Sequence, residues 1–144
     1  MTFHELISLK DPNLDPNTIK PLALAYLGDT IFDVYVRSLL VASGQQDAHK
    51  LHEKATKLVN AASQARLMRM LLDKLTEEEM TVYKHGRNQH PYSLPKNQSP
   101  VDYKTATGLE ALLGYLYLNN REDRVIELLN YGLNLISSEE TTYE

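Results

Sequence analysis

The 144-residue sequence contains no cysteine, so the chain forms no disulfide bond and no cysteine-ligated zinc site. It also lacks any apolar run of the ~18 residues that a membrane-spanning helix needs. The N-terminal segment 1–5 has neither the basic start nor the apolar centre of a signal peptide. We therefore expect a single cytoplasmic domain over residues 1–144, without a membrane segment and with a polar, frayed tail at 137–144.

Stretches in which apolar and polar residues alternate are absent as well, which argues against β-strands. Apolar residues instead recur with helical spacing, and this pattern predicts an all-α fold. Prolines exclude a continuous helix over residues 87–101, and such a long irregular connection is usually functional or disordered. The expected helices cover residues 2–9, 21–41, 47–72, 76–86, 103–118 and 122–136.

The net charge of −4 argues mildly against a nucleic-acid ligand, but the positive charges are not evenly distributed. Two segments, 44–69 and 84–104, each carry an excess of lysine and arginine. An acidic chain can still bind a polyanion through such local basic segments. The alternative is an ordinary scatter of charge over solvated helix faces.

Each of the two most apolar helices carries an acidic residue, Asp29 in the first and Glu110 in the second. Gly28 precedes Asp29, although glycine inside a helix costs ~1 kcal/mol relative to alanine. A buried carboxylate costs more still unless it is paired or binds a metal. Gly28 and Gly114 would let the two helices approach closely, which would bring Asp29 and Glu110 together. Two carboxylates without a basic partner suit a hard cation such as Mg²⁺.

Each acidic residue also has a structural interpretation. Asp29 lies on a polar stripe of its helix and can be an ordinary exposed acid. Asp33 and Arg37, four residues apart on the same stripe, can form a helix-stabilising ion pair, although Asp33 could also orient a water at a metal. Thr107 and Glu110 have the spacing of a capping box at a helix start.

Two motifs resemble those of a known family. Residues 24–29, Leu-Ala-Tyr-Leu-Gly-Asp, resemble the signature helix of the ribonuclease III domain. Residues 110–118, which begin Glu-Ala-Leu-Leu-Gly, resemble its second motif. The two motifs occur in the expected order at a suitable spacing, and residues 51–72 are similar to the helix between them, so the resemblance covers most of the chain.

The departures from that family pattern narrow the resemblance. Larger members have glutamates seven and four residues before the signature aspartate, where this chain has Leu22 and Ala25. They also have an aspartate three residues before the second glutamate, where this chain has Thr107. We expect no double-stranded-RNA-binding domain after this domain. Together with the segment 84–88, these features are similar to the single-domain bacterial branch of the family, Mini-ribonuclease III.

The resemblance implies a homodimeric, Mg²⁺-dependent endoribonuclease, with Mn²⁺ as a substitute metal. It implies cleavage of double-stranded RNA, with the paired stem of precursor 23S ribosomal RNA as the substrate. Asp29 and Glu110 match the catalytic and metal-binding positions, and the missing acids favour one protein-held Mg²⁺ over two. The alternative is a non-catalytic all-α module for RNA binding or ribosome assembly, in which both acids are structural.

Double-stranded RNA is recognised mainly through its phosphates and 2′-hydroxyls, so basic and polar side chains are the binding candidates. The irregular segment and its flanks supply the first choices, Lys84, Arg87, Asn88, Lys96 and Lys104. The preceding basic helix supplies the second choices, Lys50, Lys54 and Lys57.

The helix expected over residues 21–41 is too apolar to leave a broad face in water. Self-association along this helix is expected, as the resemblance also implies. The residues expected on this dimer helix are Leu24, Leu27, Gly28, Ile31, Phe32 and Tyr35.

Overall fold

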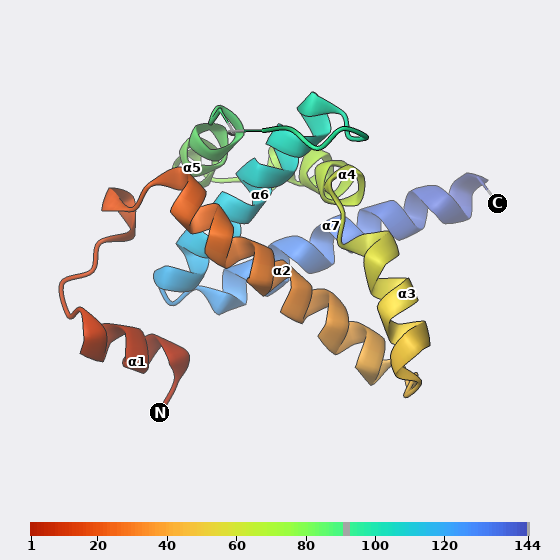
Figure 1. Ribbon diagram of the computed structural model, residues 1–144, viewed down its shortest axis with the longest axis horizontal. Coiled ribbons are helices and arrows are strands. Elements are labelled where there is room, and N and C mark those ends of the chain that lie inside the picture. Colours follow the sequence, from red (N-terminus) through yellow and green to blue (C-terminus); the bar gives the residue numbers. More distant parts are fainter. Residues whose placement is uncertain (91–92, 144) are drawn as a thin grey trace.

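The computed structural model describes residues 1–90 and 93–143, with side chains described up to residue 138, and every regular element in these residues is helical. The all-α prediction is therefore confirmed (Figure 1). The α-helices are α1 (Phe3–Lys10), α2 (Pro21–Ala42), α3 (Ala48–Leu58), α4 (Ala61–Leu71), α5 (Glu77–Arg87), α6 (Pro100–Leu118) and α7 (Glu122–Tyr143). Short 3₁₀ turns cover Pro16–Thr18 and Leu72–Lys74.

Local capping explains several helix starts. Thr76 and Glu79 form the predicted capping box of α5, in which each side chain accepts a hydrogen bond from the other residue's backbone N–H. Asp47 caps α3 by accepting from the Lys50 backbone N–H at 3.0 Å. These starts depend on side chains three residues apart, which is why the sequence predicts them well.

The single helix expected over 47–72 is wrong, because the chain breaks between α3 and α4. Asn60 has an extended backbone (φ −151°, ψ 162°), and its side chain accepts from the Ser63 N–H at 2.9 Å to start α4. The same side-chain amide donates to the carbonyl of Lys57 at 2.9 Å and so closes the end of α3. An asparagine that bonds the backbone on both sides competes with helical hydrogen bonds.

Helix α6 begins earlier than expected, at Pro100 rather than near residue 103. Ser99 is its N-cap, and proline suits the first helical position because its missing N–H would have no partner there. The hydroxyl of Thr107 donates to the Tyr103 carbonyl, one turn back within α6. Glu110 therefore lies in mid-helix, and the capping-box interpretation of Thr107 and Glu110 is wrong.

Helix α7 is longer than expected, since it continues to Tyr143 through the segment expected as a frayed tail. No glycine or proline after residue 136 stops it. None of the described helices is both long enough and apolar enough to cross a membrane.

Helix α6 occupies the centre of the molecule and packs against α2, α4, α5 and α7 (Figure 1). Its leucines 109, 112 and 113 are fully buried, and leucines 128 and 129 of α7 are fully buried in the same core. Small residues on α6 allow this many neighbours to approach one helix. The central helix is thus also the one that carries Glu110.

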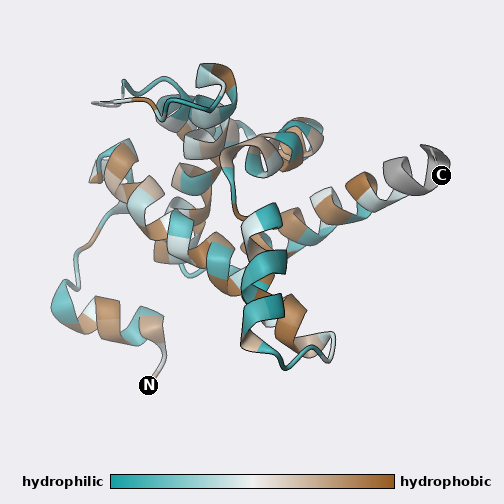
Figure 2. Ribbon diagram, turned by 45° about the vertical axis from the view of Figure 1, so that its right-hand side comes forward, coloured by the Kyte–Doolittle hydropathy of each residue, from teal (hydrophilic) through white to brown (hydrophobic). Residues whose placement is uncertain are grey.

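The outer helices α1 and α3 contribute little to this core. Figure 2 shows α1 standing apart from the bundle, and none of its residues is buried. Its Phe3 and Leu9 side chains are 73% and 67% exposed. Helix α3 buries only Ala55 and packs against α2.

Of the residues predicted to lie on the dimer helix, three face the core of their own chain. Leu24, Gly28 and Phe32 are buried against other helices of the same chain, so they are unavailable to a partner. The remaining three expected residues, at positions 27, 31 and 35, are half-buried. The apolar side chains that α2 does expose include Tyr26, Val34 and Val41.

Candidate active site

The site is built where α2 crosses α6 without intervening side chains. A Cβ atom on Gly28 would lie 1.7 Å from the backbone carbonyl oxygen of Glu110, and one on Gly114 would lie 2.1 Å from that of Leu24. No side chain fits at either position, because the obstacle is backbone rather than a movable side chain. The two helices therefore touch at both glycines, and this contact places Asp29 beside Glu110.

The two carboxyl groups come within interaction distance of each other at the crossing. Burial, then hydrogen bonding to Asp29 and its negative charge, raise the pKa of Glu110 to about 8, while the Gln64 amide acts in the opposite direction. Without a cation, the Glu110 carboxyl is thus protonated at neutral pH and donates to Asp29. A cation bound by both carboxyl groups would have to displace this proton.

A cleft of about 210 Å³ opens beside this pair. Its lining includes Leu22, Ala25 and Thr107, the three positions at which the resemblance expects further acids. The substitutions therefore remove negative charge from the site itself rather than from a distant surface. The other lining residues are Tyr26, Asp29, Gln89, Tyr103, Lys104 and Glu110.

Gln64 is a site residue that the sequence interpretation missed. It lies on α4, is 5% exposed, and contacts the Glu110 carboxyl. The signal was present in the sequence, because Gln64 is a lone amide on a helix face otherwise formed by Ala61, Ala65 and Met68. A polar residue on the apolar face of a helix needs a partner in the core.

The polar stripe of α2 divides into two parts. Asp29 lies beside Glu110, whereas Asp33 accepts a hydrogen bond from the Arg37 Nε at 2.7 Å. The ion-pair interpretation of Asp33 is thus the one the structure supports.

Three of the predicted RNA-binding residues lie together next to the cleft. Arg87, Asn88 and His90 line a second hollow, and Lys104 lines both this hollow and the cleft. The Arg87 guanidinium stacks 5.5 Å from the centre of the Tyr83 ring, and its Nε donates to the Asn88 side chain at 3.2 Å. The positive groups thus continue from the carboxylate pair toward the end of α5.

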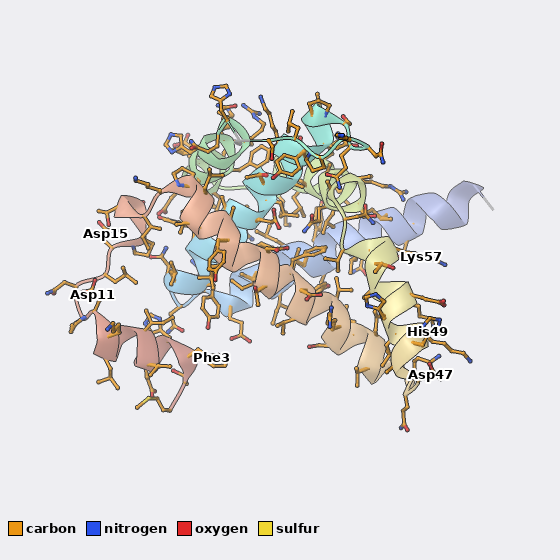
Figure 3. All side chains as sticks on the ribbon, viewed as in Figure 1. Phe3, Asp11, Asp15, Asp47, His49 and Lys57 are labelled. Atoms are coloured by element: carbon orange, nitrogen blue, oxygen red, sulfur yellow. The ribbon has the colours of Figure 1, made fainter. Side chains whose placement is uncertain are left out.

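The other candidates are more scattered. Lys84 is exposed one turn before Arg87 on α5, and Lys96 is exposed in the connection before α6. The three lysines of α3, at positions 50, 54 and 57, are exposed beside the C-terminal half of α2. Figure 3 shows Lys57 on this helix, well away from the end of α5. The structure therefore does not bring the lysines of α3 to the cleft.

The pair is a chemically suitable place for a hard divalent cation. Among the described residues, no lysine or arginine forms an ion pair with Asp29 or Glu110, and no third acid or histidine joins them. The metal ligands would be carboxylate oxygens. The Gln64 amide lies behind them, and its Nε2 has no hydrogen-bond partner among the residues that the structure describes. A cation held by few protein oxygens and several waters fits Mg²⁺ better than Ca²⁺.

Comparisons with known proteins agree with the geometry. Residues 22–121 match the Ribonuclease III domain family. The chain is 44% identical to the Mini-ribonuclease 3 of Enterococcus faecalis over 85% of this chain and 94% of that protein. It is 41% identical to the Mini-ribonuclease 3 of Brevibacillus brevis over 87% of this chain and 93% of that protein.

A solved structure has a similar fold. The crystal structure of a protein from Fusobacterium nucleatum superposes with a TM-score of 0.73 and 28% sequence identity. The superposition covers 85% of this chain and 95% of that chain. The family resemblance carried by the motifs at 24–29 and 110–118 is confirmed.

Proposed function

Since the chain belongs to the ribonuclease III family and is an endoribonuclease, we propose that it hydrolyses double-stranded RNA at the Asp29–Glu110 pair with Mg²⁺ as cofactor. The observation that carries this proposal is the α2–α6 crossing, which brings two carboxylates together in a cleft, neither of them ion-paired with a lysine or arginine of the described residues. Mn²⁺ has the same preference for oxygen ligands and is expected to substitute.

The two carboxylates would hold one metal ion. When bound, Mg²⁺ supplies Lewis-acid polarisation of the scissile phosphate and lowers the pKa of an attacking water. To hold the ion, Glu110 has to release its proton, so the pair binds better as the pH rises toward 8. Hydrolysis then proceeds by in-line attack of water on phosphorus, with the ribose 3′ oxygen leaving.

Lys104 would bind the phosphate that enters the cleft. It lines both the cleft and the neighbouring hollow, so its ammonium group can neutralise the RNA backbone between them. Arg87 and Asn88 in that hollow, with Lys84 and Lys96 nearby, would contact phosphates and 2′-hydroxyls farther along the duplex.

The biological context follows from the family resemblance. We infer that the substrate is the stem formed by the ends of precursor 23S ribosomal RNA, that cleavage takes place in the cytoplasm, and that the enzyme is a homodimer with one site per subunit. The exposed apolar residues Tyr26, Val34 and Val41 on the outer side of α2 are the surface available to a second copy. Light scattering should give twice the chain mass of 16.4 kDa.

Cleavage of a perfect RNA duplex tests the assignment. Wild-type protein should cut with Mg²⁺ and not in EDTA, and Asp29→Asn and Glu110→Gln should both be folded and inactive. Asp33→Asn is the matched control, because Asp33 is an acid one turn along α2 that pairs with Arg37 instead. The assignment is refuted if either site variant cleaves as fast as the Asp33 variant.

A further inference from the structure

Gln64 is buried in a way that the fold alone does not explain. Its side chain is 5% exposed, yet its amide nitrogen Nε2 has no hydrogen-bond partner within the part of the chain that the structure describes. Buried polar groups in folded proteins are nearly always paired, because an unpaired one costs about 1–3 kcal/mol. An apolar side chain would pack at this position of α4 without that cost, so the amide points to a role beyond packing.

This amide lies against the Glu110 carboxyl and acts on its pKa. Two side chains approach this carboxyl, one from the solvent side and one from the core. Asp29 is exposed on α2, whereas Gln64 lies on the buried face of α4. Gln64 belongs to neither of the helices that form the crossing. It therefore adds a third element, α4, to the control of where the Glu110 oxygens point.

We propose that Gln64 is a positioning residue for the cation site: its buried N–H donates to one oxygen of Glu110 when a divalent cation binds, and so directs the other oxygen to the ion beside Asp29. This inference rests on the proposed function, since it assumes that Asp29 and Glu110 hold the cation. Groups behind a ligand orient it, and their loss typically weakens metal binding by 10- to 100-fold.

A structural role for Gln64 makes a different prediction. If the amide stabilised the fold, its removal would lower the melting temperature and leave cation binding unchanged. If it positions Glu110, replacement by methionine, which has a similar length and volume, removes an unpaired buried donor. The melting temperature in EDTA should then stay the same or rise while cation affinity falls.

The test is Mn²⁺ binding to the purified full-length chain without RNA, followed by the electron paramagnetic resonance signal of the free ion. Gln64→Met should raise the dissociation constant by at least about 10-fold, with unchanged near-ultraviolet circular dichroism. Gln64→Asn keeps the amide but is one methylene shorter, so it should also weaken binding. It serves as the test variant if the methionine variant does not fold.

Thr105→Val is the matched control, because Thr105 is another buried polar residue, 6% exposed, whose hydroxyl donates to the Val101 carbonyl at 2.8 Å. Its dissociation constant should equal that of the wild type. A folded Gln64 variant that binds Mn²⁺ within twofold of the wild type overturns the inference. If instead wild type and Glu110→Gln bind Mn²⁺ equally, the proposed cation site itself is wrong, and the two failures are thereby distinguished.

Discussion

The protonation of Glu110 makes the stability of the metal-free protein depend on pH. The ordinary glutamate pKa is 4.5 and the folded protein raises it to about 8, so the folded state binds more protons than the unfolded state between these values. Stability therefore falls as the pH rises from about 4.5 to about 8 and stays low above that. At 1.36 kcal/mol per pH unit the upper limit is about 5 kcal/mol.

Glu110 is only half-buried, so relaxation of solvent and of Asp29 reduces this limit. We expect a loss of about 2 kcal/mol or more from Glu110 alone. The substitution Glu110→Gln removes the titration, keeps the shape and still offers an N–H to Asp29. The variant should therefore match the wild type near pH 5 and be more stable above pH 8.

Urea unfolding in EDTA at pH 5 to 9, followed by circular dichroism, measures this difference directly. Subtracting the two curves cancels the histidines and other groups that both proteins share. Mg²⁺ at pH 8 should restore the wild-type stability and leave Glu110→Gln unchanged, because only a binding-competent folded state gains from ligand. Parallel curves for the two proteins across the whole range would refute the argument that burial and Asp29 keep Glu110 protonated.

Three further predictions concern the crossing, the RNA contacts and the core. Gly28→Ala forces the two helices apart, since its Cβ would meet the Glu110 carbonyl; urea unfolding should show a loss of about 3 kcal/mol or more, together with lost Mn²⁺ binding. Lys104→Ala should reduce the slope of log affinity for duplex RNA against log salt by about 1, whereas Lys50→Ala should leave the slope unchanged. Arg124→Met leaves the buried Glu79 carboxylate without its partner at 2.8 Å, which should cost about 3–5 kcal/mol in chemical denaturation.

Local signals in the sequence predicted the starts of α3 and α5 and the convergence of the two acids. The capping residues act over three positions, and Gly28 and Gly114 mark close contact because glycine in an apolar helix is otherwise unfavourable. Asn60 was missed, because its bonds to both neighbouring helices can be recognised only when the break is already known. Whether a residue of an apolar helix faces its own core or a partner is not encoded locally. Leu24, predicted to lie on the dimer helix, is buried against its own chain.

The contact between Gln64 and Glu110 could not be predicted from the sequence, for a different reason. It joins residues 46 positions apart on two helices, and no periodicity in either helix specifies how α4 turns against α6. The same holds for Lys104, whose place between the cleft and the hollow depends on where α5 ends. Nonlocal packing thus decided the details of the site, while its two acids were visible in the motifs.

Helices α2 and α6 are held at a fixed separation by direct contact between their backbones. Because main-chain atoms meet at Gly28 and Gly114, the separation of the two helices is set by backbone atoms, which substitutions at positions other than these two glycines leave in place. Exchanges on outer helices such as α3 would then alter stability or surface charge without shifting Asp29 against Glu110. The outer surface of this protein can accordingly be remodelled, for a new duplex preference or for immobilisation, while the alignment of its two carboxylates stays as it is.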